Sequence, residues 1–231
     1  MTAMDGVLVR GLGATGAVVL ACAVMCGCVR MTDGTPSLDA DARPVVLAEA
    51  LIDPSRFPPA YQAAILDPQA TGEAVAAVDG VPTGAAVEPA GCAPPRVGPD
   101  PRRTVAAQGV DPSTGAALTV ILTRADAALS SRRDQLARCA SVTATAGEVV
   151  STVDTVLLPP PPVDADDSLA TEATIVRSTE PPVRVLALSA QVNEVWLTVA
   201  WLNNDPDTPP DTSALDTLFT DALLTLRRAA P

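Results

Sequence analysis

The sequence contains no histidine and no lysine, and only five of its 231 residues are aromatic. A serine nucleophile therefore has neither an imidazole base nor a Ser–Lys partner. The chain also lacks a G-x-S-x-G elbow and a G-K-[ST] phosphate loop, and a zinc site would have to be built without histidine. We therefore expect a protein that is not an enzyme and that holds no cofactor and no metal.

The charge of the chain is strongly negative. Its 15 cations are all arginine and face 27 acidic residues, which gives a net charge of −12. Such a surface repels phosphate backbones, so nucleic-acid binding is not expected. It also repels anionic lipid headgroups, so any attachment to a membrane would depend on acyl chains.

The N-terminal segment has the pattern of a bacterial lipoprotein signal peptide. A short charged start leads into an apolar run from Gly11 that closes with Gly27 and Cys28. We expect residues 1–27 to be removed and Cys28 to carry the lipid, which anchors the protein to the extracytoplasmic face of the cell membrane. A single membrane-spanning helix and an ordinary secretory signal without an anchor are the alternatives.

The remaining chain is predicted to form a flexible stalk over residues 28–42 and a single extracytoplasmic domain over residues 43–231. Two cysteines remain in that domain, Cys92 and Cys139. An even pair in an oxidising compartment predicts one disulfide, with a pair of free thiols as the alternative.

The hydrophobic pattern predicts an α+β fold. Helices are expected over residues 44–52, 127–140 and 213–228, and residues 67–103 are expected to be mostly loop. Strands are expected over residues 61–66, 104–108, 117–123, 149–158, 184–191 and 194–202, while Leu169–Arg177 fits either a strand or a helix. The sum is an antiparallel sheet of about five or six strands with the helices packed mainly on one face.

Two tryptophans lie five residues apart on the last predicted strand, so they point to opposite faces of the sheet. Trp201 shares an apolar face with Val195, Leu197 and Val199, which should meet the helices. Trp196 shares the other face with Thr198 and Ala200. These three residues are the candidate ligand-binding residues, and simple cover of an outer face is the alternative.

Several segments carry a resemblance to a known family. They are Leu51–Tyr61, Val87–Pro95 with the later Cys139, Pro160–Asp167 and Ala214–Phe219. Together they resemble LppI-like mycobacterial lipoproteins, which are built around a C-terminal domain of unknown function. The layout is more distantly similar to the extracellular sensor domain of PknH-type Ser/Thr kinases. The resemblance implies a cell-envelope lipoprotein with a ligand-sensing role and supplies no catalytic residues.

Two functions from different classes follow from these patterns. The first is a non-enzymatic binding or sensor domain whose sheet presents a groove to a small apolar or lipid ligand. The second is a structural or interaction lipoprotein that recruits an envelope protein partner. An enclosed apolar pocket above about 300 Å³ would favour the first.

Overall fold

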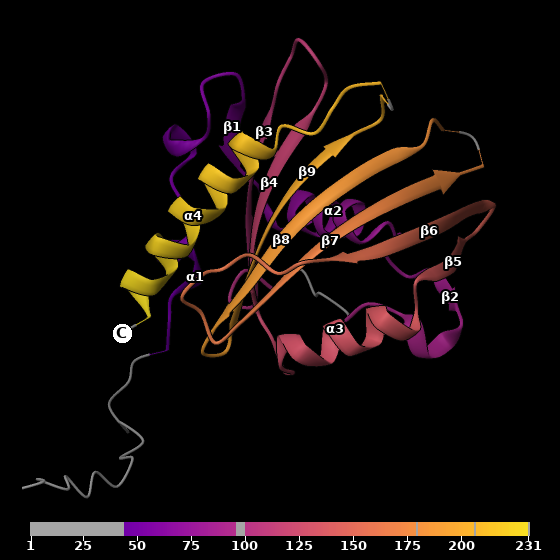
Figure 1. Ribbon diagram of the computed structural model, residues 1–231, viewed down its shortest axis with the longest axis horizontal. Coiled ribbons are helices and arrows are strands. Elements are labelled where there is room, and N and C mark those ends of the chain that lie inside the picture. Colours follow the sequence, from indigo (N-terminus) through magenta and orange to yellow (C-terminus); the bar gives the residue numbers. More distant parts are fainter. Residues whose placement is uncertain (1–43, 96–99, 179, 206, 231) are drawn as a thin grey trace, which may run out of the picture. The chain divides into compact units, whose positions relative to one another are not determined.

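A computed structural model describes residues 44–95, 100–178, 180–205 and 207–230 of the chain (Figure 1). The predicted signal peptide at residues 1–27, the acylation site Cys28 and the predicted stalk at residues 28–42 lie outside the described residues. The residues that the structure describes all belong to one compact unit. In the part of the chain that the structure describes, no helix is both long enough and apolar enough to cross a bilayer.

The domain is built on one antiparallel sheet of nine strands in the order β1-β3-β4-β9-β8-β7-β6-β5-β2. Strands β5 to β9 form a meander, and β9 then pairs with β4, which leads outward through β3 to β1. The strands are β1 (Gln62–Ile65), β2 (Ala86–Glu88), β3 (Thr104–Val110), β4 (Ala117–Arg124), β5 (Ser141–Ala146), β6 (Val149–Leu158), β7 (Asp167–Arg177), β8 (Val183–Val192) and β9 (Val195–Asn203).

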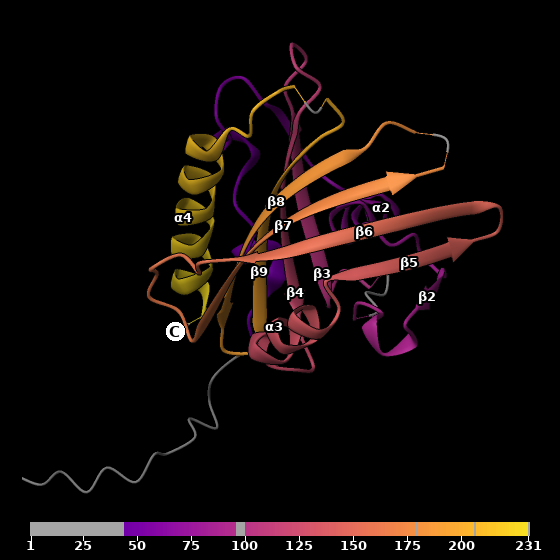
Figure 2. The same ribbon diagram turned by 45° about the vertical axis from the view of Figure 1, so that its right-hand side comes forward.

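Helices cover both faces of this sheet. On one face lie α1 (Leu47–Ala50) and α4 (Thr212–Ala229), and α4 packs on β4, β8 and β9. On the other lie α2 (Pro68–Asp79) and α3 (Leu129–Arg138), with α2 contacting β3 and β4 and α3 contacting β6 and β7. Figures 1 and 2 show α4 and α2 on opposite sides of the central strands. Two short 3₁₀ helices, η1 (Pro54–Arg56) and η2 (Ala90–Cys92), complete the described elements.

The largest core lies between α4 and the sheet. Asp211 caps the helix, since its carboxylate accepts from the backbone N–H of Ala214 at 3.0 Å. The buried apolar stripe of α4 consists of Leu215, Leu218, Phe219, Ala222, Leu223 and Leu226. It meets Trp201, Leu197 and Val199 of β9, all fully buried. The prediction that Trp201 lies on the sheet face that packs against a helix is therefore confirmed.

The predicted sheet of about five or six strands is wrong, because the sheet has nine. The expectation that the helices pack mainly on one face is also wrong, since α2 and α3 cover the second face. Residues 67–103 are not mostly loop, because they contain α2 and β2. The sequence signals of these elements are weak: β2 has three residues, β5 consists of small residues, and α2 buries only Thr71 and Ala74.

One predicted helix is shorter in the structure than expected, and one segment of ambiguous prediction is now assigned. The expected helix over residues 44–52 shortens to α1, because the backbone is already extended at Val46 and at Leu51. The ambiguous segment Leu169–Arg177 is a strand and forms most of β7.

Gly80 ends α2 in the left-handed conformation, with φ of 70°. A Cβ at this position would lie 2.7 Å from side-chain carbons of Ile175 and Val153 in the second, smaller core. Gly84 also has a positive φ, of 79°, but nothing lies within 4 Å of the place where its Cβ would be. An alanine would therefore strain the backbone at both positions but would meet neighbouring side chains only at Gly80.

We predict that Gly80→Ala destabilises the domain more than Gly84→Ala does. Both variants lose about 1–2 kcal/mol to the left-handed backbone, and Gly80→Ala loses a further 1–3 kcal/mol, roughly, to overpacking. Urea denaturation of the two variants measures the difference. Equal losses of unfolding free energy would contradict the close approach of Gly80 to the side chains of Val153 and Ile175.

Candidate functional site

A cavity of about 450 Å³ lies between the sheet and the two helices α2 and α3. Pockets for small organic ligands have volumes of about 300–1,000 Å³. The space lies on the face of the sheet opposite to α4, where alternate residues of β3, β4 and β6 to β9 form its floor.

The floor of the cavity combines small hydroxyl side chains with apolar ones such as Ile121, Leu169 and Val185. Thr198 of β9 stands opposite Ser189 of β8, and their hydroxyls form a hydrogen bond of 3.0 Å. Thr104, Thr123 and Thr171 line the cavity from β3, β4 and β7. These hydroxyl side chains are short and leave room above the strands, whereas the opposite face of β9 is filled by Leu197, Val199 and Trp201.

The roof of the cavity carries four large apolar side chains. Val75 and Val78 project from α2, and Leu129 and Leu136 project from α3. Apart from the charged residues Asp79 and Arg132, these helices therefore face the cavity with apolar side chains, and most of the hydroxyl groups lie on the floor.

An ion pair joins the two roof helices. Arg132 of α3 donates to the carboxylate of Asp79 at the end of α2 at 3.2 Å, and it also donates to Gln135 at 2.6 Å. Both partners of the ion pair are largely buried and both line the cavity. Burial raises the pKa of Asp79, and the neighbouring guanidinium of Arg132 offsets only part of that rise.

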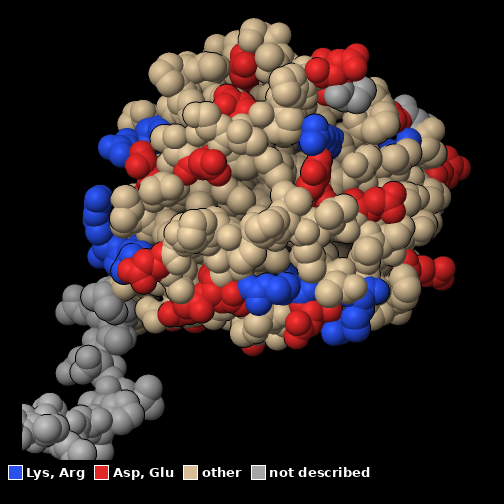
Figure 3. Space-filling model, viewed as in Figure 1, with Lys and Arg blue, Asp and Glu red and all other residues tan. Residues whose placement is uncertain are grey.

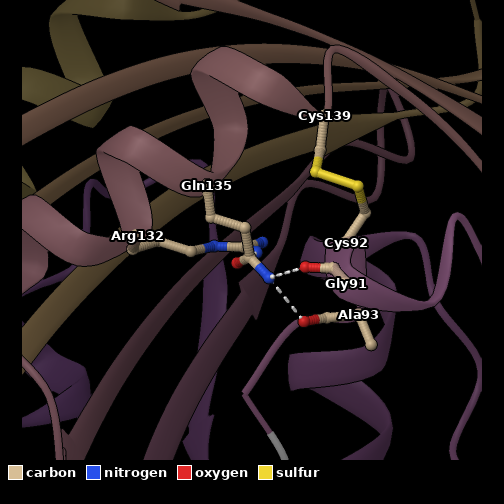
Figure 4. Close-up of a disulfide and its surroundings, with 6 residues drawn as sticks. All are labelled: Gly91, Cys92, Ala93, Arg132, Gln135 and Cys139. Carbon is tan, nitrogen blue, oxygen red and sulfur yellow. Dashed lines mark hydrogen bonds between the residues drawn. A yellow bond between two sulfur atoms is a disulfide. The ribbon is translucent and has the colours of Figure 1, made fainter.

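A disulfide holds the C-terminal end of α3. Cys139, which follows the helix, is joined to Cys92 in η2, and their Cα atoms are 5.6 Å apart (Figure 4). Gln135 strengthens the same junction, because its Nε2 donates to the carbonyl oxygens of Gly91 at 3.2 Å and Ala93 at 2.8 Å. The cysteine pair is the one that the sequence predicts.

The N-terminal end of α3 is held by the sheet itself. No residue of the helix caps its first turn, and instead the side chain of Gln191 on β8 accepts from the backbone N–H of Leu129 at 2.7 Å. Arg133 reaches Asp167 and the carbonyl oxygen of Ser168 at the start of β7. The helix is thus attached at both ends as well as to α2.

The arginines that line the cavity all have partners. Besides the Asp79–Arg132 pair, Arg103 pairs with Asp126 at 2.6 Å and Arg124 pairs with Glu194. Among the described residues, no group of three or more His, Cys, Asp and Glu side chains could hold a metal ion.

The structure places two of the three candidate ligand-binding residues at the cavity. Trp196 and Thr198 line it, whereas Ala200 is fully buried on the same face within the second core. The indole Nε1 of Trp196 and the hydroxyl of Thr104 are buried without a hydrogen-bond partner.

Sequence reasoning missed the other parts of the site. Alternating threonines in the strands could have indicated a hydroxyl-bearing face. Asp79 and Arg132 carried no signal, because the element that holds Asp79 was not predicted.

Comparison with known proteins gives a family but no activity. The chain belongs to the family described as Domain of unknown function (DUF5642), whose model matches residues 52–227. A search of curated proteins found no match. Among solved structures, the chain is similar to an uncharacterized protein from Mycobacterium smegmatis, with 18% sequence identity and a TM-score of 0.42. That similarity covers 75% of this chain and 92% of the other.

We predict that Arg132→Met destabilises the domain in a pH-dependent way. It leaves the carboxylate of Asp79, about three-quarters buried, without its cation, which costs about 3 kcal/mol at neutral pH. Burial raises the pKa of Asp79 in the folded protein above its ordinary value of 3.8, so the cost of its charge disappears well below pH 3.8, where the carboxyl is protonated in both the folded and the unfolded states. The loss therefore grows as the pH rises through the raised pKa.

Urea denaturation at about pH 3 and about pH 7 measures this change. The control makes the same substitution in an Asp79→Asn background, where the difference in unfolding free energy between Asp79→Asn and the double variant should not depend on pH. A loss in the single variant that is equal at both pH values would show that Asp79 is not the group left without a partner.

Proposed function

We propose that this protein is a non-enzymatic lipoprotein of the cell envelope, anchored to the extracytoplasmic face of the membrane through Cys28, whose domain binds a small, largely apolar molecule. The binding site is the cavity between the sheet and helices α2 and α3. The observation that carries the proposal is the volume of that cavity, about 450 Å³, together with its apolar roof.

The surroundings of the cavity also support binding rather than catalysis. The described titratable groups that line it are engaged in ion pairs, and the chain has no histidine or lysine to move a proton. Trp196 offers a large apolar surface at one end of the floor. The signal-like N-terminal segment and the resemblance to mycobacterial lipoproteins support the anchored location.

The proposed anchor is tested by metabolic labelling with palmitate. The wild-type protein should incorporate the label and sediment with membranes, whereas Cys28→Ala should do neither, because the thioether-forming sulfur is gone. Cys26→Ala is the matched control and should behave as the wild type. Label retained in Cys28→Ala would contradict the assignment of the acylated residue.

The proposed binding site is tested by filling the cavity. Thr171→Phe places a ring on its floor, and the matched control Thr174→Phe places the same ring on the exposed opposite face of β7. Native mass spectrometry of protein purified from its host should show an additional apolar mass on the wild type and on Thr174→Phe but not on Thr171→Phe. A bare mass for all three proteins would contradict ligand binding.

A second candidate function is supported by the uncovered part of the sheet. On the face that carries α4, Val156 of β6 and Val176 of β7 are 60% and 44% exposed. Figure 3 shows this face as mainly uncharged, with acidic and basic residues dispersed over it. An interaction protein would recruit its partner here, in which case Thr174→Phe and not Thr171→Phe would abolish crosslinking to that partner in cells.

A further inference from the structure

We infer that the cavity selects an uncharged molecule that carries both an apolar chain and an oxygen acceptor, in the manner of a fatty acyl ester, over a fatty acid anion or a pure hydrocarbon. This inference rests on the proposed function and narrows the class of its ligand. It follows from the charges at the cavity, the hydroxyls on its floor and the apolar roof.

The charges at the cavity disfavour an anion. Its arginines, Arg103, Arg124 and Arg132, are each paired with a carboxylate. A carboxylate bound at the roof would have to break the largely buried Asp79–Arg132 pair or remain buried beside Asp79 without a cation, whereas the pairs of Arg103 and Arg124 are more exposed to solvent. Both outcomes cost free energy that a neutral molecule avoids.

The floor of the cavity disfavours a pure hydrocarbon. Thr123, Thr171, Ser189 and Thr198 present hydroxyls from four neighbouring strands. Thr104, 3% exposed, adds a hydroxyl without a hydrogen-bond partner. A hydrocarbon would displace water from this surface without replacing its hydrogen bonds, which weakens binding.

A neutral ester satisfies both sides of the cavity. A carbonyl oxygen accepts a hydrogen bond from a hydroxyl of the floor, where each Ser or Thr O–H can rotate to donate. The alkyl chain then lies against Val75, Val78, Leu129 and Leu136 of the roof. No ion pair at the cavity has to open.

Three probes of matched chain length test the inference: sodium decanoate, methyl decanoate and undecane. Each is titrated at neutral pH into the domain of residues 42–231, the compact unit that contains all described strands, helices and the disulfide. Binding is followed by the emission of Trp196, obtained by subtracting the signal of Trp196→Phe, which retains Trp201. Methyl decanoate should bind at least about tenfold tighter than either other probe.

The variant Thr198→Val removes one hydroxyl from the floor while nearly preserving its shape. It should reduce the advantage of methyl decanoate over undecane severalfold and leave its advantage over decanoate unchanged. Decanoate or undecane binding as tightly as the ester to the wild type would overturn the inference while leaving the proposed function intact. Binding of none of the three, with Thr171→Phe giving the same flat titration, would overturn the proposed function itself.

Discussion

The attachment of α3 at both of its ends is the constraint on which the cavity depends. A void under a helix forfeits apolar contacts, so a helix held by packing alone would settle onto the sheet. Here the Cys92–Cys139 disulfide holds one end and Gln191 holds the other. The Asp79–Arg132 ion pair then couples α3 to α2. These directional links keep the roof in place without requiring that the space below it be filled.

The two faces of the sheet have different roles: one forms the larger core under α4, and the other lines the cavity. In β9 one set of alternate residues is large and apolar and is buried under α4, where Trp201 and Leu197 belong to the larger core. The intervening set, Trp196 and Thr198, lines the cavity. One strand therefore contributes both to the larger core and to the cavity, because successive side chains point to opposite faces.

The sequence predicts the parts of the fold whose patterns are local and strong. The helix over residues 213–228, the strands over residues 184–191 and 194–202 and the cysteine pair all have such patterns. It does not predict α2 or β5, which consist mainly of small residues and owe their conformation to tertiary packing. The sequence therefore predicts only part of the site. The positions of Trp196 and Thr198 follow from the alternation of side chains along a strand. The Asp79–Arg132 pair does not, because it forms only where two helices meet across the cavity.

Amide hydrogen exchange in α3, compared before and after reduction of the disulfide, tests this account most directly. If the cysteine link holds the roof over the cavity, reduction should accelerate exchange in residues 132–138 by at least about tenfold more than in the buried turns of α4. Exchange in α3 that stays as slow after reduction as before, or that changes only in step with α4, would contradict the central role of this attachment.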